Sequence, residues 1–92
     1  MIRNFRHKGL DRFFRESDRR GVDAKQADRI RRILDRLDVV ARPEDMALSG
    51  YAFQPLKGDR KGTYSVSVPG NWRITFGFVD GDATDVNWED YH

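Results

Sequence analysis

TYSVSVPGNWRITFGF, residues 63–78, is the stretch that decides the fold of this 92-residue chain. Apolar residues occupy every second position on both sides of Pro69-Gly70, which is the period of half-buried β-strands. Proline fixes φ at the first central position of a type II turn, and glycine accepts the positive φ of the second. The stretch therefore predicts two antiparallel strands joined by a tight turn.

Strand alternation also divides the side chains of this stretch between two faces of a sheet. One face would be apolar and would pack against helices: Val66, Val68, Trp72, Ile74, Phe76 and Phe78. The other face would be polar, with no helix over it: Ser65, Ser67, Asn71, Arg73 and Thr75. An uncovered polar face that carries an arginine is a candidate site. Alternatively, Arg73 could form a structural ion pair with an acidic residue on a neighbouring strand, such as Asp85.

Further strands are predicted on both sides of this stretch. Downstream, Asp80-Gly81 is a strong signal for a two-residue hairpin turn. The alternation of Val86 and Trp88 with polar residues then predicts the strand that follows it. Upstream, residues 51–56 predict a strand that leads into a turn at residues 57–60.

The N-terminal half has the period of helices instead. Leu10, Phe13 and Phe14 share one face of a helix predicted over residues 8–16. A longer apolar stripe predicts a second helix over residues 24–40, ending before Pro43: Ala27, Ile30, Leu34, Leu37 and Ala41. Asp23 and Gln26 have the spacing of a capping box at its start. The opening MIRNF alternates weakly and predicts a short edge strand.

Together these elements predict one α+β domain over residues 1–92, in the order β-α-α-β-β-β-β. Two N-terminal helices would pack on one face of a small, mostly antiparallel sheet of four to five strands. Composition agrees with a folded domain, since 38% of residues are hydrophobic and 35% are charged. The absence of cysteine excludes a disulfide framework and a thiol nucleophile, and no apolar run approaches the length of a membrane span. We therefore expect a cytoplasmic protein with no membrane contact.

The net charge of +2 conceals a marked division along the chain. Residues 1–42 hold 13 Lys and Arg against 7 Asp and Glu, whereas residues 43–92 hold 4 against 8. Most of the basic residues are arginines, whose planar guanidinium suits phosphate oxygens. The basic half thus favours a nucleic acid or an acidic protein as partner, contacted by Arg29, Arg31, Arg32 and Arg36. A solvated helix face is the alternative.

The residues that could do chemistry lie in the acidic half. Lys57 stands next to a glycine in a turn, and Asp90-Tyr91-His92 closes the chain. Histidine titrates near neutral pH, so His92 could transfer a proton, and Asp90 could act as a base or orient it. Tyr91 could stack on a nucleobase. The alternatives are a solvated turn for Lys57, packing for Tyr91 and a frayed terminus for His92.

Several motifs resemble the HigB-type toxins of the RelE/ParE superfamily, and the resemblance runs over nearly the whole chain. The motifs are MIRNFRHKGL at residues 1–10, PLKGDR at 55–60, YSVSV at 64–68, NWRITF at 71–76 and DYH at 90–92. Their joint occurrence in this order is specific, although each alone would be weak. The resemblance implies a RelE-like fold and a ribosome-dependent endoribonuclease that cuts mRNA in the decoding site and so inhibits translation.

The resemblance also implies partners. These are the 70S ribosome with its mRNA, and a cognate helix-turn-helix antitoxin similar to HigA, which would neutralise the toxin and repress the operon. Operator DNA would be contacted only through the antitoxin. No metal and no other cofactor is expected, because the 2′-OH of the RNA would serve as the internal nucleophile.

Residue roles follow from the same resemblance. The catalytic set would be Lys57, Arg73, Asp90, Tyr91 and His92, and the RNA-binding set would be Gln54, Asn71 and Arg60. Gln54 stands where family members often have histidine, and an amide cannot exchange a proton near pH 7. The acid–base role would then fall on Asp90 and His92. Relatives also commonly have two aromatics where this chain has Thr63-Tyr64.

Two other functions are compatible with the same fold, because function resides in the site. One is a toxin that binds DNA gyrase without cutting RNA, as ParE-type relatives do. The other is an inactive homologue that persists as a co-repressor with its antitoxin, for which Gln54 is the indication. The acid–base cluster favours the nuclease, since a gyrase-binding protein does not require one.

Overall fold

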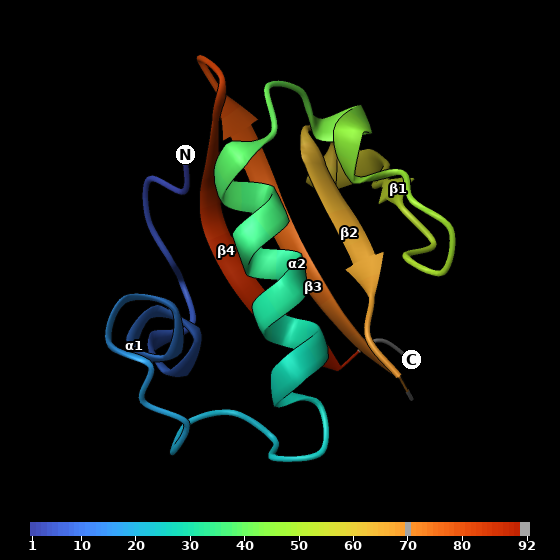
Figure 1. Cartoon of the computed structure of the whole chain (residues 1–92). Coiled ribbons are helices and arrows are strands. Elements are labelled where there is room, and N and C mark those ends of the chain that lie inside the picture. The colour runs from blue at the N-terminus through green and yellow to red at the C-terminus, as the bar shows by residue number, and fades with distance from the viewer. Residues whose placement is uncertain (70, 91–92) are drawn as a thin grey trace.

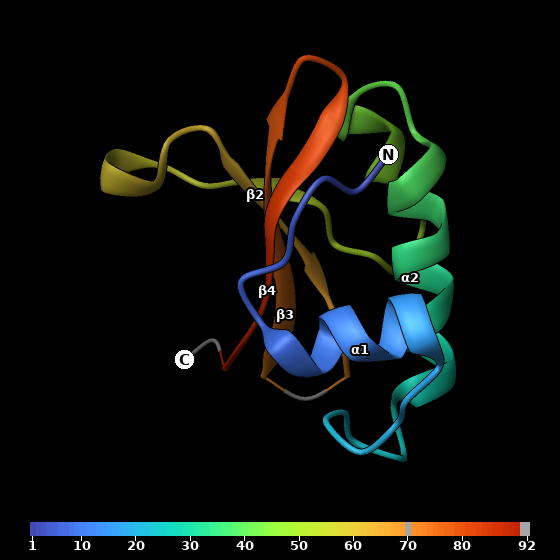
Figure 2. The ribbon, with the colours of Figure 1, turned by 90° about the vertical axis from the view of Figure 1, so that its left-hand side faces the viewer.

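The computed structural model describes residues 1–69 and 71–90. Its centre is a four-stranded antiparallel sheet in the order β1-β2-β3-β4 (Figure 1). The strands are β1 (Gln54–Pro55), β2 (Thr63–Ser67), β3 (Trp72–Val79) and β4 (Asp82–Asp90). The helices are α1 (Lys8–Glu16), α2 (Ala27–Val39) and two 3₁₀ turns, η1 (Pro43–Met46) and η2 (Gly58–Arg60). Both α-helices lie on one side of the sheet (Figure 2), as the α+β prediction requires.

The two longest strand pairings confirm the predicted alternation. Val66 of β2 lies opposite Ile74 of β3, and Ser65 lies opposite Thr75, so the apolar and polar residues segregate as expected. Asp80 and Gly81 have φ of 52° and 84°, which is the backbone of a type I′ turn and matches the right-handed twist of the hairpin. The predicted type II turn at Pro69-Gly70 includes a residue that lies outside the described ones.

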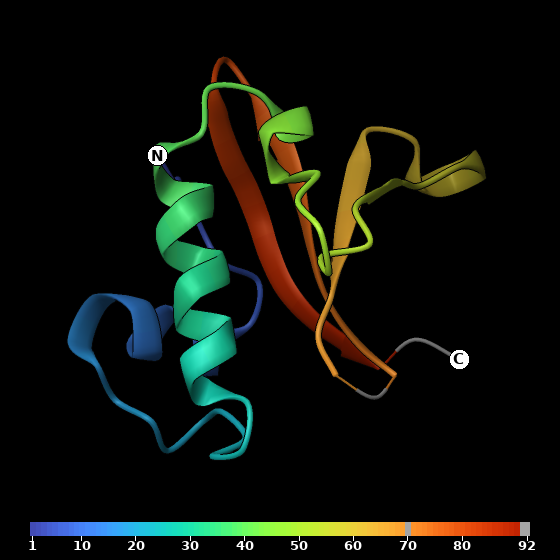
Figure 3. The ribbon, with the colours of Figure 1, turned by 45° about the vertical axis from the view of Figure 1, so that its right-hand side comes forward.

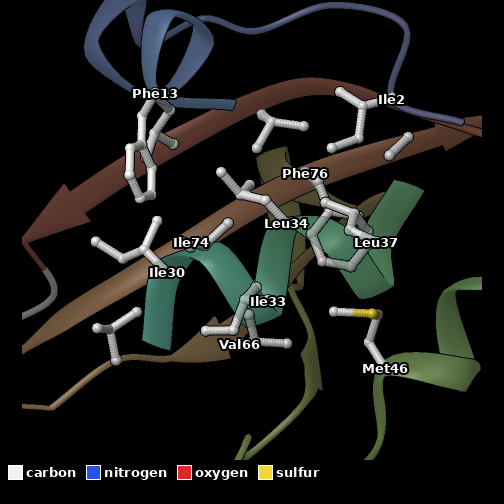
Figure 4. Close-up of a cluster of buried hydrophobic side chains, with 14 of the residues drawn as sticks. Ile2, Phe13, Ile30, Ile33, Leu34, Leu37, Met46, Val66, Ile74 and Phe76 are labelled. Atoms are coloured by element: carbon white, nitrogen blue, oxygen red, sulfur yellow. The ribbon is translucent and has the colours of Figure 1, made fainter. Parts of the chain in front are cut away.

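The side of the sheet that faces the helices, here called the apolar face, holds the core. Figure 4 shows Ile30, Leu34 and Leu37 of α2 directed at Ile74 and Phe76 of β3. All five side chains are fully buried. The stripe of apolar residues at steps of three and four places them on one side of α2, so a single helix covers the middle of the sheet.

The start of α2 differs from the prediction. The helix begins at Ala27, three residues later than expected, and its N-cap residue Gln26 makes no side-chain cap. Asp23 accepts a hydrogen bond from the Lys25 amide at 2.9 Å, which forms a local turn before the helix. The Gln26 side chain donates instead to the carbonyl of Pro69 at 3.0 Å. The predicted capping box is therefore wrong, because both side chains bond elsewhere.

The strand expected over residues 51–56 shrinks to Gln54–Pro55. Ala52 has a φ of 46°, which interrupts extended backbone, and proline has no N–H to continue a ladder. The carbonyl of Tyr51 still accepts from the Ser67 amide at 2.6 Å. The segment thus follows β2 without forming a regular strand along its length.

The N-terminal segment is also less regular than the expected edge strand. It runs parallel to β4 along its outer side and meets it at two isolated bridges, Ile2 to Ala83 and Phe5 to Val86. The bulge in β4 explains the interruption, since Asp85 has a φ of 50° and lies between the two bridges. Beyond the segment, His7 caps α1, because its Nδ1 accepts from the Leu10 amide at 3.1 Å.

Candidate functional site

The side of the sheet away from the helices, here called the polar face, is not as open as the alternation suggested. Ser65 and Thr75 are buried, although both were expected on an uncovered surface. The loop after β1 rises on this side (Figure 2), and its residue Arg60 reaches across to Glu89 above Thr75. A hollow of ≈ 280 Å³ remains beside them, lined by Arg6, Asp59, Arg60, Thr63, Thr75, Gly77, Asp85, Asn87 and Glu89.

Arg73 lies on the polar face of β3, as predicted, and its guanidinium points towards β1. Its Nη2 donates to Oε1 of Gln54 at 3.1 Å and to the carbonyl of Ala52 at 3.4 Å. The structure therefore brings together two of the predicted site residues, one from each side of β2. The alternative pairing with Asp85 is wrong, because the β3–β4 register puts Glu89 opposite Arg73 and places Asp85 four residues away along β4.

Lys57 lies at the start of η2, on the loop that rises from the polar face (Figure 3). The loop turns at Gly58 and Gly62, whose φ values of 66° and 95° are in the region that glycine adopts without strain. Lys57 and Lys61 are exposed, and both line a second hollow, of ≈ 470 Å³, that extends to Tyr64. Two ammonium groups beside a partly apolar groove suit an anionic ligand that also has a flat apolar part.

Glu89 accepts hydrogen bonds from two other side chains of the polar face. Both of its carboxylate oxygens accept from Arg60, at 2.8 and 2.6 Å, and Oε2 also accepts from the Thr75 hydroxyl at 2.5 Å. The Arg60 guanidinium, and to a lesser degree the Thr75 hydroxyl, lower the pKa of Glu89 from its ordinary 4.5 to about 2. Glu89 lies opposite Arg73 in the β3–β4 register. A carboxylate held this way stays ionised throughout the physiological range.

The remaining predicted site residues lie at the ends of β3 and β4. Asp90 is exposed and lies opposite Trp72, one position beyond the register partners Arg73 and Glu89, so strand alternation directs it away from the polar face that carries Arg73. Asn71 immediately precedes β3 and is exposed as well. Tyr91 and His92, two members of the expected catalytic set, lie outside the described residues.

Sequence reasoning assigned no role to Glu89 or Asn87, and it gave Thr75 only a place on the polar face. The signal for them was present, because all three share the alternation that placed Arg73 on the polar face. Alternation could not show the position of Arg60, which comes from a loop 29 residues earlier and binds Glu89, the residue that also accepts from Thr75.

Comparison with known protein families identifies the family of this chain. The model of the HigB-like toxin family, described as the RelE-like toxin of the type II toxin–antitoxin system HigB, matches residues 3–92. The chain belongs to this family. It is also 45% identical over 92 residues to the Endoribonuclease HigB of Proteus vulgaris, and the alignment covers 100% of both chains. A HigB-like toxin of a type II system acts together with an antitoxin, so a protein partner is part of its function.

The basic half of this HigB-like toxin is less available to partners than its sequence suggested. Arg29 donates to the carbonyl of Gly50 at 2.6 Å, Arg31 to that of Phe13 at 3.1 Å, and Arg36 to that of Asp45 at 3.0 Å. These three guanidinium groups therefore fasten α2 to its neighbours. Arg32 is exposed, so the expected contact with a partner remains a prediction for this residue.

Within residues 1–69 and 71–90, no three His, Cys, Asp or Glu side chains gather in a way that could hold a metal ion. No helix in the same part of the toxin has the length and apolar character to cross a membrane.

Proposed function

We propose that this HigB-like toxin is an endoribonuclease that cuts mRNA on the ribosome and thereby inhibits translation. The observation that carries the proposal is the full-length identity of 45% to a protein named Endoribonuclease HigB. The arrangement at this end of the sheet supports it, because Arg73 lies beside Gln54 on the polar face and Asp90 ends β4 one register position further on, directed to the opposite face. Cationic and carboxylate groups at one end of a sheet suit a reaction that moves a proton next to a phosphate.

The reaction would use the 2′-OH of the RNA as nucleophile, without a metal ion. The hydroxyl oxygen attacks the adjacent phosphorus and gives up its proton, the P–O5′ bond breaks, and the leaving oxygen takes a proton. Asp90 and His92 are our candidates for the two proton transfers, which typically contribute ~10²–10⁴-fold. Arg73 would stabilise the additional negative charge on the phosphorane as a preorganised donor.

The other predicted residues would bind the RNA. Lys57 would contact a phosphate from its exposed loop, and Arg60, whose terminal nitrogens are paired with Glu89, would border the RNA on the same loop without binding its phosphates. Gln54 and Asn71 would position the nucleotides, and Tyr91 would stack on a base. Gln54 supports this division of roles, because its Oε1 holds the Arg73 guanidinium and an amide supplies hydrogen bonds without titrating.

The partners that we propose are the 70S ribosome with its mRNA and a helix-turn-helix antitoxin similar to HigA. The antitoxin would neutralise the toxin and bind operator DNA, so that the toxin reaches the operator only through the antitoxin. We place this activity in the cytoplasm, where translating ribosomes are found.

The test is cleavage of a defined mRNA by the purified toxin, with and without programmed 70S ribosomes, followed by mapping of the new 5′ ends. We expect cuts within the codon of the decoding site, only when ribosomes are present, and unchanged by EDTA levels that leave the ribosomes intact. A gyrase supercoiling assay run on the same preparation examines the ParE-like function. Inhibition of gyrase without RNA cleavage would overturn the proposal. No effect in either assay would indicate the inactive co-repressor.

A further inference from the structure

We infer that Glu89 is a positioning residue that fastens the Lys57 loop to the sheet through Arg60. This inference rests on the proposed function, since it concerns where Lys57 stands relative to Arg73 and the residues that follow β4. It assigns a role to a residue outside the expected catalytic and RNA-binding sets.

The geometry of the ion pair is the first observation. Arg60 presents two terminal nitrogens to the two oxygens of Glu89, at 2.8 and 2.6 Å, which is the paired arrangement that a guanidinium and a carboxylate favour. Thr75 donates its hydroxyl to the same carboxylate at 2.5 Å and so fixes the Glu89 side chain from β3. Three elements therefore meet at one group: the loop, β3 and β4.

The loop itself is the second observation. It projects from the sheet (Figure 3), and Gly58 and Gly62 give it little intrinsic stiffness. At its base the Leu56 amide donates to the carbonyl of Thr63 at 2.9 Å, which closes the loop but does not fix the direction in which it leaves the sheet. The ion pair ties η2 to β4 and supplies that direction. Lys57 precedes Arg60 by three residues, and the Arg60 amide donates to its carbonyl at 3.3 Å.

The placement of Glu89 in the sheet is the third observation. It lies opposite Arg73 and is adjacent to Asp90, so the loop is fastened at the position where β3 and β4 carry their predicted catalytic residues. The distance from Lys57 to that end of the sheet consequently depends on the pair. Misplacement of a catalytic group by about 1 Å can cost 10²-fold in rate, which is why such a fastening matters for the reaction.

Two other roles, proton transfer by Glu89 and phosphate binding by Arg60, explain the Arg60–Glu89 contacts less well than fastening of the loop does. Glu89 is poorly suited to proton transfer, because both of its carboxylate oxygens already accept hydrogen bonds from Arg60 and Thr75, which makes them weak bases. An RNA phosphate could bind Arg60 only by displacing a carboxylate that already occupies the same two nitrogens. Fastening of the loop requires no change in the contacts that Glu89 makes with Arg60 and Thr75.

The experiment is a double-mutant cycle on Arg60→Ala and Glu89→Gln, with two independent measurements. The first is hydrogen exchange of the amides of residues 57–62 in the free toxin, which needs neither ribosome nor cleavage. We expect both single variants to raise exchange in this loop at least tenfold, and the double variant to raise it no further. Thermal unfolding of each variant verifies that the sheet remains folded.

The second measurement is single-turnover cleavage on programmed ribosomes. We expect each single variant to lose about tenfold, and the double variant to lose no more than the worse of the two, since both changes break one contact. Asp85→Asn is the matched control, because Asp85 also lines the hollow beside Glu89 and its positive φ suits asparagine. It should leave loop exchange and cleavage unchanged.

Two results would overturn the inference. One is unchanged loop exchange in Glu89→Gln. The other is weaker and less salt-dependent ribosome binding in Arg60→Ala, with a log–log slope smaller by about 0.7, while Glu89→Gln binds as well as the wild type or better. That second pattern would assign Arg60 to a phosphate. If the wild type cuts no RNA, the exchange measurement still decides on the fastening, so the two proposals fail separately.

Discussion

The two faces of the sheet differ in what holds their side chains in place. On the apolar face, Val66, Ile74 and Phe76 are fully buried against α2. The hydrophobic effect that stabilises them is non-directional, so it does not require a particular partner atom for each side chain. On the polar face, Thr75 and Glu89 are held by hydrogen bonds to particular partners. Adjacent residues of β3 therefore serve different purposes: one face supplies stability, and the other holds polar groups in the geometry that a site needs.

Ile74→Ala should have the largest effect on folding. Removal of most of a fully buried isoleucine side chain beneath α2 costs about 2–5 kcal/mol, through lost burial and the cavity that remains. For a domain of this size we expect the thermal midpoint to fall by at least 8 °C. Calorimetry or circular dichroism measures the change. A loss below about 1 kcal/mol would contradict the assignment of the core to this face.

Arg73→Ala tests the adjacent residue, which points to the opposite face. Loss of one preorganised donor typically reduces the rate by ~10²–10³-fold, and we expect that loss in single-turnover mRNA cleavage. Stability should change far less than in Ile74→Ala, because Arg73 contributes hydrogen bonds to Gln54 and Ala52 but is not part of the core. Cleavage at the wild-type rate would show that Arg73 is a structural residue of the sheet.

Deletion of His92 tests whether the polar face continues into the end of the chain. If His92 transfers a proton, cleavage should fall by ~10² or more while the thermal midpoint stays within a few degrees. The pH–rate profile should lose one limb, and His92→Gln should behave in the same way, since an amide keeps the hydrogen bond without titrating. An active deletion variant with a flat profile would leave Asp90 as the remaining candidate.

Acid should lower the free energy of unfolding by removing the interactions of Glu89 on the polar face. The pKa of Glu89 is lowered to about 2 by Arg60 and Thr75, so its ionised form stabilises the folded state. That contribution is complete above pH 5 and disappears as the pH falls from about 4.5 towards 2. We expect about 1–3 kcal/mol from this source, given that the side chain is 23% exposed. Urea unfolding at pH 7 and pH 3 measures it. Glu89→Gln should show a smaller difference between the two pH values, and an equal difference would contradict the assignment.

The features that could be predicted from the sequence are those that depend on local periodicity and turn residues. Alternation placed Val66 and Ile74 in the core and Arg73 on the polar face, and Asp80-Gly81 located the hairpin turn. Each of these features is decided by residues near one another in the chain. The same holds for α1, whose predicted bounds at residues 8 and 16 match the structure.

Features that depend on long-range partners could not be predicted. Asp23 and Gln26 have the spacing of a capping box, but the carbonyl of Pro69 is the partner that Gln26 takes in the folded chain. Ala52 departs from extended backbone in the segment that Arg73 contacts, which no local pattern signals. Within the site, the motifs pointed to Lys57, Arg73 and the end of the chain, whereas Glu89 required the position of a loop.

The N-terminal segment along β4 has a consequence for how a partner can attach. Sheets often recruit another chain by adding its extended backbone to an exposed edge. Residues 2–6 already occupy the outer edge of β4, and the opposite edge, β1, is two residues long and contains a proline. In the part of the toxin that the structure describes, neither edge offers a long ladder for such pairing. We therefore expect an antitoxin to recognise this toxin through side-chain surfaces and not by adding a strand to the sheet.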